Sequence, residues 1–168
     1  MMKSLIAATV LTMTLIPALA SAQKMVILIR HAERADGQAT MTTMTGAPAD
    51  PPLSDAGAAR ARKLAAMLAD ANITAMFTTE FRRTKDTAGP LAARLQLTPE
   101  VVAAAQTAVM VEKIRARAND TVFVVGHSNT VPGIIKALGG PDVTIGDNEY
   151  DNLFIYLPAT KTLTRIRY

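Results

Sequence analysis

The chain contains two histidines, and each closely follows an apolar run that is rich in β-branched residues. The residues before His31 read Lys-Met-Val-Ile-Leu-Ile-Arg, and those before His127 read Thr-Val-Phe-Val-Val-Gly. Such runs are typical of buried parallel strands, and ligands of open α/β sheets bind beyond the carboxyl ends of these strands. We therefore expect the two histidines to share one site at one edge of one sheet.

Arg30 and His31 are residue types that suit phosphoryl chemistry. Histidine titrates near neutral pH, and the adjacent positive charge of Arg30 disfavours protonation, which leaves a ring nitrogen with a lone pair for attack. The planar guanidinium of arginine matches a phosphoryl group with a fork of donors. The pair could supply a nucleophile and an anion clamp. The alternative is an ordinary polar pair at a strand end, because a doublet alone specifies no geometry.

The second histidine lies in a Gly-His-Ser-Asn segment, residues 126–129, directly before an expected helix. Glycine permits a close backbone approach, and the free N–H groups at a helix start favour a negative ligand. His127 and Ser128 could therefore hold phosphoryl oxygens. The alternative is that Ser128 or Asn129 caps the helix and His127 is a bystander.

A third segment, residues 79–88, contains two adjacent arginines after another expected strand. Adjacent residues of a helix point about 100° apart, so only one of Arg82 and Arg83 can face the edge of the sheet. The alternative is that both are solvated. Asp86 is expected to form an ion pair with Arg83, about one helical turn away.

The elements that would position these residues alternate between strand and helix. We expect strands at 24–29, 75–79, 121–125, 153–157 and 162–166, and helices at 54–71, 80–95, 105–118 and 129–138. Ser54 is the expected N-cap of the first helix, on which Arg60 is expected to be solvated. Residues 98–102 suit either a helix start or a short strand. The alternation predicts a three-layer α/β/α sandwich with a mostly parallel sheet.

The stretch from Ala35 to Pro52 is expected to be a loop. Its length of about 18 residues exceeds that of ordinary connections, which favours a functional or mobile loop. The alternative is a disordered surface excursion.

The composition and charge of the chain limit the classes of function that it can have. Residues 1–22 are typical of a secretory signal peptide, which predicts a secreted or periplasmic domain at 23–168 without a later membrane span. The alternative is an uncleaved anchor, which is disfavoured because the apolar stretch is shorter than a spanning helix needs. The chain has 168 residues, no cysteine and a net charge of +4, so it cannot form disulfides or a thiolate metal site. Its basic residues are scattered, which favours small anions over nucleic acid as partners. The oligomeric state is not predicted.

Together these segments resemble the histidine phosphatase superfamily, of the phosphoglycerate mutase-like clan, and its small phosphohistidine-phosphatase-like branch. The family signature is Arg-His-Gly near the N-terminus, a Ser-x-x-x-Arg-x-x-x-Thr-Ala segment and a later Gly-His. This chain has Arg30-His31-Ala32, then Thr79 with Arg83 and Thr87-Ala88, then Gly126-His127-Ser128. Residues 53–61 also resemble the family's Leu-Thr-x-x-Gly-x-x-Arg-Ala helix start, so the resemblance extends from Met25 to about Leu157.

The resemblance implies roles for four residues. His31 would attack phosphorus and become a phosphohistidine, which divides the reaction into two steps. Arg30, Arg83 and His127 would bind the phosphoryl oxygens and stabilise the charge in transit. Arg83 is preferred over Arg82 because it lies four residues before Thr87, as in the family pattern. Water would then release phosphate, and no metal or other cofactor is implied.

Two departures from the family pattern matter. Ala32 replaces the usual glycine, as is common in the smaller phosphatases that resemble this chain. No position matches the family's proton-donating carboxylate. Glu33 and Glu149 are the candidate proton donors, the first because it is nearest to the proposed nucleophile in sequence. Glu149 precedes an expected edge strand together with Asp147 and Asp151.

The sequence therefore predicts a metal-independent phosphoric monoester hydrolase with few substrate contacts beyond the phosphate. Relatives of similar size include an exported phosphatase of lipopolysaccharide core sugars and a cytosolic phosphohistidine-protein phosphatase, and the expected signal peptide counts against the second. Mutase activity is disfavoured because the chain lacks the mutase insertions. One alternative is a non-catalytic phosphate- or anion-binding module of the same fold. Another, a metal site at His31 and His127, is disfavoured by the adjacent arginines.

Overall fold

The computed structural model of the chain describes residues 24–36, 50–117 and 119–168. The expected signal peptide at 1–22 and residues 37–49 of the expected loop lie outside the described residues. The two ends of that loop lie together, because Arg34 forms an isolated antiparallel bridge with Leu53. In the described ranges, no helix has the length and apolar character that crossing a membrane requires.

The described residues form a six-stranded sheet in the order β3-β2-β4-β1-β5-β6. The strands are β1 (Met25–Arg30), β2 (Ala75–Thr78), β3 (Glu100–Val101), β4 (Thr121–Gly126), β5 (Asn152–Leu157) and β6 (Thr162–Arg167). The first four strands are parallel, whereas β5 pairs antiparallel with β1 and β6 antiparallel with β5. The sheet is therefore mostly parallel, as predicted. The strand at 152–157, expected at an edge, lies inside the sheet because β6 covers it.

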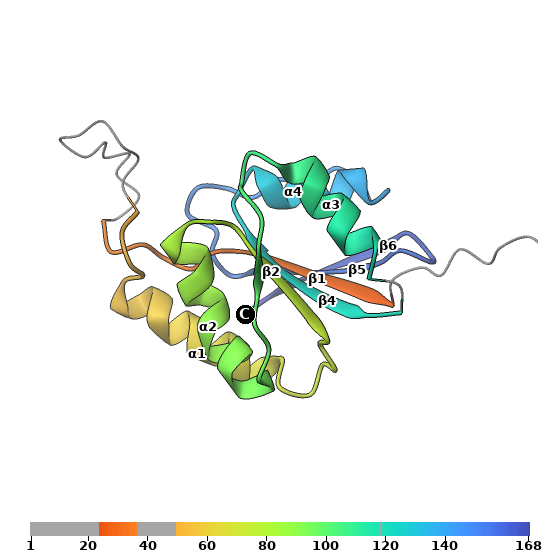
Figure 1. Cartoon of the computed structure of the whole chain (residues 1–168). Helices are drawn as coiled ribbons and strands as arrows, with labels where there is room; N and C mark the ends of the chain where they lie inside the picture. The colour runs from red at the N-terminus through yellow and green to blue at the C-terminus, as the bar shows by residue number, and fades with distance from the viewer. Residues whose placement is uncertain (1–23, 37–49, 118) are drawn as a thin grey trace, which may run out of the picture.

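Helices cover both faces of this sheet (Figure 1). They are α1 (Asp55–Met67), α2 (Arg82–Leu95), α3 (Thr107–Arg115) and α4 (Thr130–Ala137). Successive side chains of β1 alternate between the two faces, so Val26 and Leu28 belong to one core cluster while Ile27 and Ile29 belong to the other. The helices α1 and α2 lie on the second of these faces and α3 and α4 on the first. The predicted three-layer α/β/α sandwich is confirmed.

The start of α1 follows from local chemistry. The side chain of Ser54 accepts a hydrogen bond from the backbone nitrogen of Gly57 at 3.1 Å, as expected of an N-cap. A Cβ added to Gly57 would lie 2.2 Å from the carbonyl oxygen of Glu33, so only glycine allows α1 to approach the segment after β1 this closely. The helix ends at Met67, earlier than expected, because the chain turns at residues 68–70 and Asn72 adopts a positive φ of 52°.

The open choice at residues 98–102 is resolved in favour of a strand. Glu100 and Val101 pair in parallel with Phe77 and Thr78, which makes this short segment one edge of the sheet. The following helix begins at Thr107 and ends at Arg115, within the expected range of 105–118.

The register between β1 and β4 places the two histidines side by side. Arg30 is paired with Gly126, and the backbone nitrogen of His31 donates to the carbonyl oxygen of Gly126 at 2.9 Å. His31 and His127 therefore leave neighbouring parallel strands at the same level. Both strands are buried over nearly their whole length, which fixes this arrangement in the centre of the sheet.

Candidate active site

The carboxyl ends of the central strands border a pocket of about 390 Å³. Most of its lining residues are charged or polar. They are Arg30, His31, Arg34, Phe81, Arg83, Ala104, His127, Ser128, Asn129 and Asp147. The structure thus brings together five of the residues singled out in the sequence, namely Arg30, His31, Arg83, His127 and Ser128.

His31 and His127 lie against each other at this pocket. Their ring centroids are 5.3 Å apart with an interplanar angle of 65°, and the two residues are only 4% and 7% exposed. The Nδ1 atom of His31 lies 2.8 Å from the carbonyl oxygen of Ala32. Since a carbonyl oxygen only accepts, Nδ1 carries the proton in the neutral ring, and the lone pair is on Nε2. The Nε2 atom is therefore the ring nitrogen whose lone pair is available for attack.

The surroundings of His31 keep its ring uncharged. Burial lowers the pKa of His31 from 6.5 to about 4, against the opposing effect of the hydrogen bond to Ala32. The positive charges of Arg83 and Arg30 lower this pKa further. At neutral pH the imidazole is therefore unprotonated and able to attack an electrophile.

His127 is held by a chain of hydroxyl groups at the start of α2. Its Nε2 atom lies 2.9 Å from Oγ1 of Thr79, which lies 3.0 Å from Oγ1 of Thr84. Because the Thr84 hydroxyl donates to the carbonyl oxygen of Phe81 at 2.8 Å, the Thr79 hydroxyl donates to Thr84 and accepts from His127. Burial, followed by the charge of Arg83, lowers the pKa of His127 to about 3, so this ring is also neutral.

Thr87 ties the segment after β1 to α2. The backbone nitrogen of Ala32 donates to Oγ1 of Thr87 at 2.9 Å, and that hydroxyl donates to the carbonyl oxygen of Arg83 at 2.7 Å. One side chain therefore fixes the position of the residue after His31 relative to the helix turn that carries Arg83. The Thr-Ala part of the sequence motif thus has a positioning role.

Of the two adjacent arginines, Arg83 faces the pocket. Its side chain is 13% exposed and stacks on the Phe81 ring at 4.0 Å, whereas the Arg82 side chain is 57% exposed. The expected pairing of Asp86 with Arg83 is wrong. Asp86 instead lies 3.2 Å from Nε of Arg82, because Arg82 is four residues away and shares its solvent-facing side of the helix. Among the described residues, Nε of Arg83 is buried without a hydrogen-bond partner.

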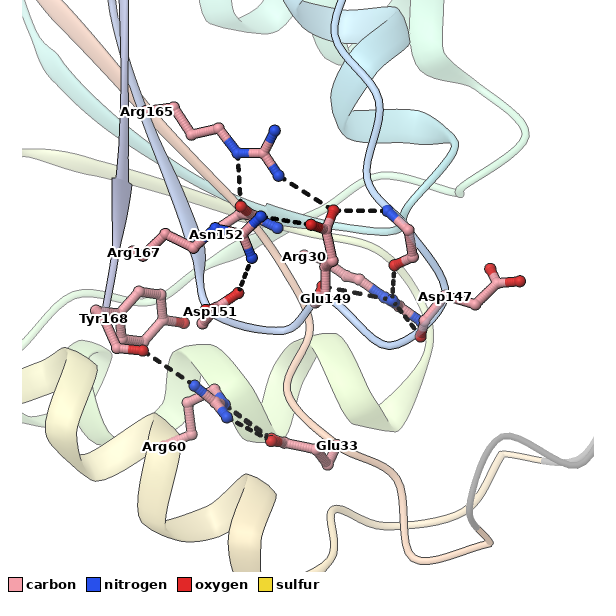
Figure 2. Close-up of polar contacts among 11 residues, drawn as sticks. Arg30, Glu33, Arg60, Asp147, Glu149, Asp151, Asn152, Arg165, Arg167 and Tyr168 are labelled. Atoms are coloured by element: carbon pink, nitrogen blue, oxygen red, sulfur yellow. Dashed lines mark hydrogen bonds and ion pairs between the residues drawn. The ribbon is translucent and has the colours of Figure 1, made fainter.

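Arg30 connects the pocket to the loop before β5. Its Nη1 atom donates to the carbonyl oxygens of Gly146 and Asp147 at 2.9 and 2.7 Å. The guanidinium carbon also lies 4.2 Å from the centre of the Tyr150 ring. This one guanidinium therefore both lines the pocket and fixes the loop beside it (Figure 2).

Sequence reasoning missed Arg34, which is a third arginine of the pocket wall and forms an ion pair with Asp36. Its position three residues after His31 was the available signal. Arg34 contributes to the lowering of the pKa of both histidines. Three guanidinium groups around neutral imidazoles form a site suited to a multiply charged anion.

The two carboxylates considered as proton donors lie elsewhere. Glu33 binds Arg60, with Oε1 2.6 Å from Nη2. Burial raises the pKa of Glu33, but the hydrogen bond from Arg60, a backbone hydrogen bond and the charges of Arg60 and Arg30 together lower it below its usual value. Arg60 also donates to the carbonyl oxygen of Tyr168 at 3.2 Å, so it is not the solvated residue expected. The pocket lining contains neither Glu33 nor Glu149.

Glu149 stabilises the loop before β5. It accepts a hydrogen bond from the backbone nitrogen of Gly146 at 2.8 Å and pairs with Arg165 and Arg167. The hydrogen bond from Gly146, followed by that from Arg167, lowers the pKa of Glu149 to about 2. Glu149 is therefore ionised at neutral pH, and its oxygens are engaged within the cluster in Figure 2.

The start of α4 differs from the expected capping by Ser128 or Asn129. Asn129 is at the N-cap position but makes no hydrogen bond through its side chain. Instead, Oγ1 of Thr130 accepts from the backbone nitrogen of His127 at 2.8 Å. A Cβ on Gly126 would lie 2.7 Å from that hydroxyl oxygen, so glycine leaves room here for the Thr130 side chain.

A phosphate-sized anion, rather than a cation, suits this charge distribution. Within the described ranges, no three histidine, cysteine or acidic side chains gather where they could hold a metal ion. The arginines around the histidines would also repel a metal ion. A buried neutral imidazole beside a second histidine and arginine donors suits the binding of phosphoryl groups.

Residues 26–106 match the family model described as "Histidine phosphatase superfamily (branch 1)". The match includes His31 and Arg83, and the structure adds His127 from beyond the matched range. Over the matched residues the chain is therefore similar to the histidine phosphatase superfamily. No curated protein sequence matches the chain.

Solved structures of phosphatases share the fold. The protein histidine phosphatase SixA, complexed with tungstate, is 18% identical, covers 84% of this chain and 94% of its own, and has a TM-score of 0.62. A mycobacterial glucosyl-3-phosphoglycerate phosphatase with inorganic phosphate is 14% identical over 86% of this chain and 95% of its own, with a TM-score of 0.63. A phosphoserine phosphatase from Entamoeba histolytica, with 3-phosphoglyceric acid, is 13% identical over 84% and 94%, with a TM-score of 0.61.

Proposed function

We propose that this protein is a metal-independent phosphatase that hydrolyses phosphomonoesters through a phosphohistidine on His31. One observation carries the proposal: a buried His31 whose Nδ1 is bound to a carbonyl oxygen, so that Nε2 holds the lone pair beside His127. The match to the histidine phosphatase superfamily model supports the reaction class.

In the first step, the lone pair of Nε2 attacks phosphorus. The N–P bond forms as the bond from phosphorus to the ester oxygen breaks, and that oxygen leaves with the bonding electron pair and takes up a proton. Arg30 and Arg83 bind the non-bridging oxygens, whose negative charge the neighbouring Arg34 also stabilises. The attacking ring is neutral before the step, because the pKa of His31 is lowered to about 4.

In the second step, a water molecule attacks the same phosphorus. The O–P bond forms and the N–P bond breaks, which returns the electron pair to Nε2 and the proton of water to a base. Inorganic phosphate leaves and His31 is again neutral. The same arginines hold the oxygens in both steps, with His127 and Ser128 at the same wall, so the phosphoryl group need not move far between the two steps. Neutral His127 donates its one N–H to Thr79, so it borders the phosphoryl group without donating to the oxygens.

The substrate is proposed to be a phosphomonoester recognised mainly through its phosphate. The pocket wall is dominated by groups that bind anions, with Phe81 as its large apolar side chain. The similar structures are named for different phosphorylated compounds, so they support phosphate recognition but no particular leaving group. A panel of sugar phosphates, nucleotides, phytate and phosphohistidine would rank the candidates by kcat/KM.

Hydrolysis of p-nitrophenyl phosphate by the purified protein, in the presence of EDTA, tests the proposal. We expect turnover that EDTA leaves unchanged and that the His31→Ala variant lacks. Binding of phosphate or vanadate without turnover would instead indicate a non-catalytic anion-binding module. Activity that needs added zinc would contradict metal independence.

We also propose that the protein is exported and that residues 1–22 are removed. The support is the apolar stretch Leu5–Leu19 after Lys3, followed by a small-residue site at Ala20-Ser21-Ala22. If the leader is cleaved there, the protein recovered from its native host should have the intact mass of a chain that begins at Gln23. A mass that includes Met1 would contradict the proposal.

A further inference from the structure

We propose that Asp147 is the general acid that protonates the departing ester oxygen and then the base that takes a proton from the attacking water. This role rests on the phosphatase function proposed above. It identifies a donor for the proton that the leaving group takes up, which neither Glu33 nor Glu149 is positioned to donate.

Asp147 lies on the side of the pocket where the leaving group is expected. It is the one acidic residue among the described residues that line the wall, and it is exposed whereas His31 is buried. In phosphoryl transfer the attacking and leaving atoms lie roughly in line with phosphorus. His31 is buried at the floor of this pocket, so a leaving group opposite its Nε2 atom points toward the open side, where an exposed wall residue can reach it.

The backbone of Asp147 is fixed to the phosphate-binding machinery. Arg30 donates from Nη1 to the carbonyl oxygens of Gly146 and Asp147 at 2.9 and 2.7 Å. From the other side, Oε2 of Glu149 accepts from the backbone nitrogen of Gly146 at 2.8 Å. An arginine proposed to bind the phosphoryl oxygens thus also sets the place of Asp147, which couples the positions of phosphate and carboxyl group.

The carboxylates of Glu149 and Glu33 are engaged in ion pairs outside the pocket lining. In Figure 2 the carboxylate of Glu149 points toward Asn152, into its cluster with Arg165 and Arg167, whereas that of Asp147 points away from this cluster. Glu33 lies at the other end of the view, bound to Arg60. Glu149 therefore stabilises the loop, and Asp147 is the acidic residue of this loop that lines the pocket.

The proton balance closes over the two steps. The acid form of Asp147 gives its proton to the ester oxygen as the bond to phosphorus breaks, and the leaving group departs as a neutral alcohol. The resulting carboxylate takes a proton from the water that attacks the phosphohistidine. Asp147 is then in its acid form again, His31 is neutral, and no further reactant is needed.

The leaving-group dependence of the Asp147→Asn variant tests this assignment. Aryl phosphates of similar size differ in how much their leaving oxygen needs a proton, with phenyl phosphate needing it most and 2,4-dinitrophenyl phosphate least. We expect the variant to lower kcat/KM for phenyl phosphate about 100-fold or more, and for 2,4-dinitrophenyl phosphate by less than about threefold. The constant kcat/KM reports on the first step alone, so the second step does not obscure the comparison.

The ratio of the two kcat/KM values is independent of how much of the variant is folded, because both substrates sample the same active molecules. Asp142→Asn is the matched control, since Asp142 lies in the same connection, pairs with Lys136 and is absent from the pocket lining. It should leave both values unchanged. Equal losses for both substrates in Asp147→Asn, or no loss, would overturn the role of Asp147. A wild-type protein that hydrolyses neither substrate would overturn the phosphatase function itself.

Discussion

The rings of His31 and His127 meet edge to face at a centroid distance of 5.3 Å. This contact follows from the parallel pairing of β1 with β4, in which Arg30 lies opposite Gly126 and each histidine directly follows the last residue of its strand. Two imidazoles this close, with arginines around them, cannot both be charged at low cost. The geometry of the sheet therefore sets the protonation state of the site.

The first prediction concerns these protonation states. Burial, with smaller contributions from the arginines, lowers the pKa of His31 to about 4 and that of His127 to about 3. The chain has only two histidines, so an NMR titration follows two imidazole signals, which the His31→Ala variant assigns. We expect both rings to stay neutral down to about pH 5. A midpoint near 6.5 for either ring would contradict the described burial.

The second prediction follows by linkage. A histidine whose pKa is lower in the folded than in the unfolded state stabilises the fold above the unfolded value of 6.5, and this stability is lost as the pH falls through the folded value. Between pH 7 and pH 5 the unfolded chain takes up protons that the folded chain does not. The free energy of unfolding should fall by on the order of 3 kcal/mol over this interval.

Urea unfolding at a series of pH values measures how the free energy of unfolding depends on pH. In the double variant His31→Asn, His127→Asn, the free energy of unfolding should change little between pH 7 and pH 5, whatever its absolute value. A wild-type slope that persists in the double variant would assign the effect to other groups.

Arg83 and Arg82 form a matched pair for the third prediction. Arg83→Ala removes a pocket guanidinium and should lower kcat/KM for p-nitrophenyl phosphate about 100-fold or more. Arg82→Ala removes a largely exposed side chain paired with Asp86 and should change it by less than about threefold. The reverse order of the two effects would show that the wrong arginine has been placed at the phosphate.

The fourth prediction concerns the support of the site by α1. Gly57→Ala places a methyl group against the carbonyl oxygen of Glu33 and should destabilise the protein by about 2 kcal/mol or more, since backbone must move. Gly133→Ala in α4 is the control, because the nearest atom to its added Cβ is a Thr107 methyl at 3.9 Å. It should be neutral or stabilise by up to about 1 kcal/mol. Thermal melts of both variants make the comparison, and equal stabilities would refute the close contact at Gly57.

The central sheet and the strand-end histidines were predictable because their signals are local. An apolar run followed by Arg30-His31 or by Gly126-His127 indicates a buried strand and its end without knowledge of the rest of the chain. The same holds for Ser54, whose capping bond spans three residues. Selecting Arg83 over Arg82 needed only the helical repeat and the family spacing.

The parts that could not be predicted depend on contacts between distant segments. Glu33 pairs with Arg60, and the sequence alone does not reveal that α1 lies close enough for this contact. The placement of Asp147 depends on Arg30 binding the carbonyl oxygens of its loop, 117 residues further along the chain. Arg34 reaches the pocket because the chain turns back after β1 to pair with Leu53. None of these contacts leaves a periodic signal in the sequence.

Trapping the phosphorylated enzyme tests the central claim most directly. The purified protein is mixed with p-nitrophenyl phosphate, quenched within milliseconds in alkali, where phosphohistidine survives, and digested for mass spectrometry. We predict one phosphoryl group on His31, attached at Nε2, and none in the His31→Ala variant. Rapid turnover without any phosphorylated enzyme, or a phosphoryl group on a different side chain, would contradict the account.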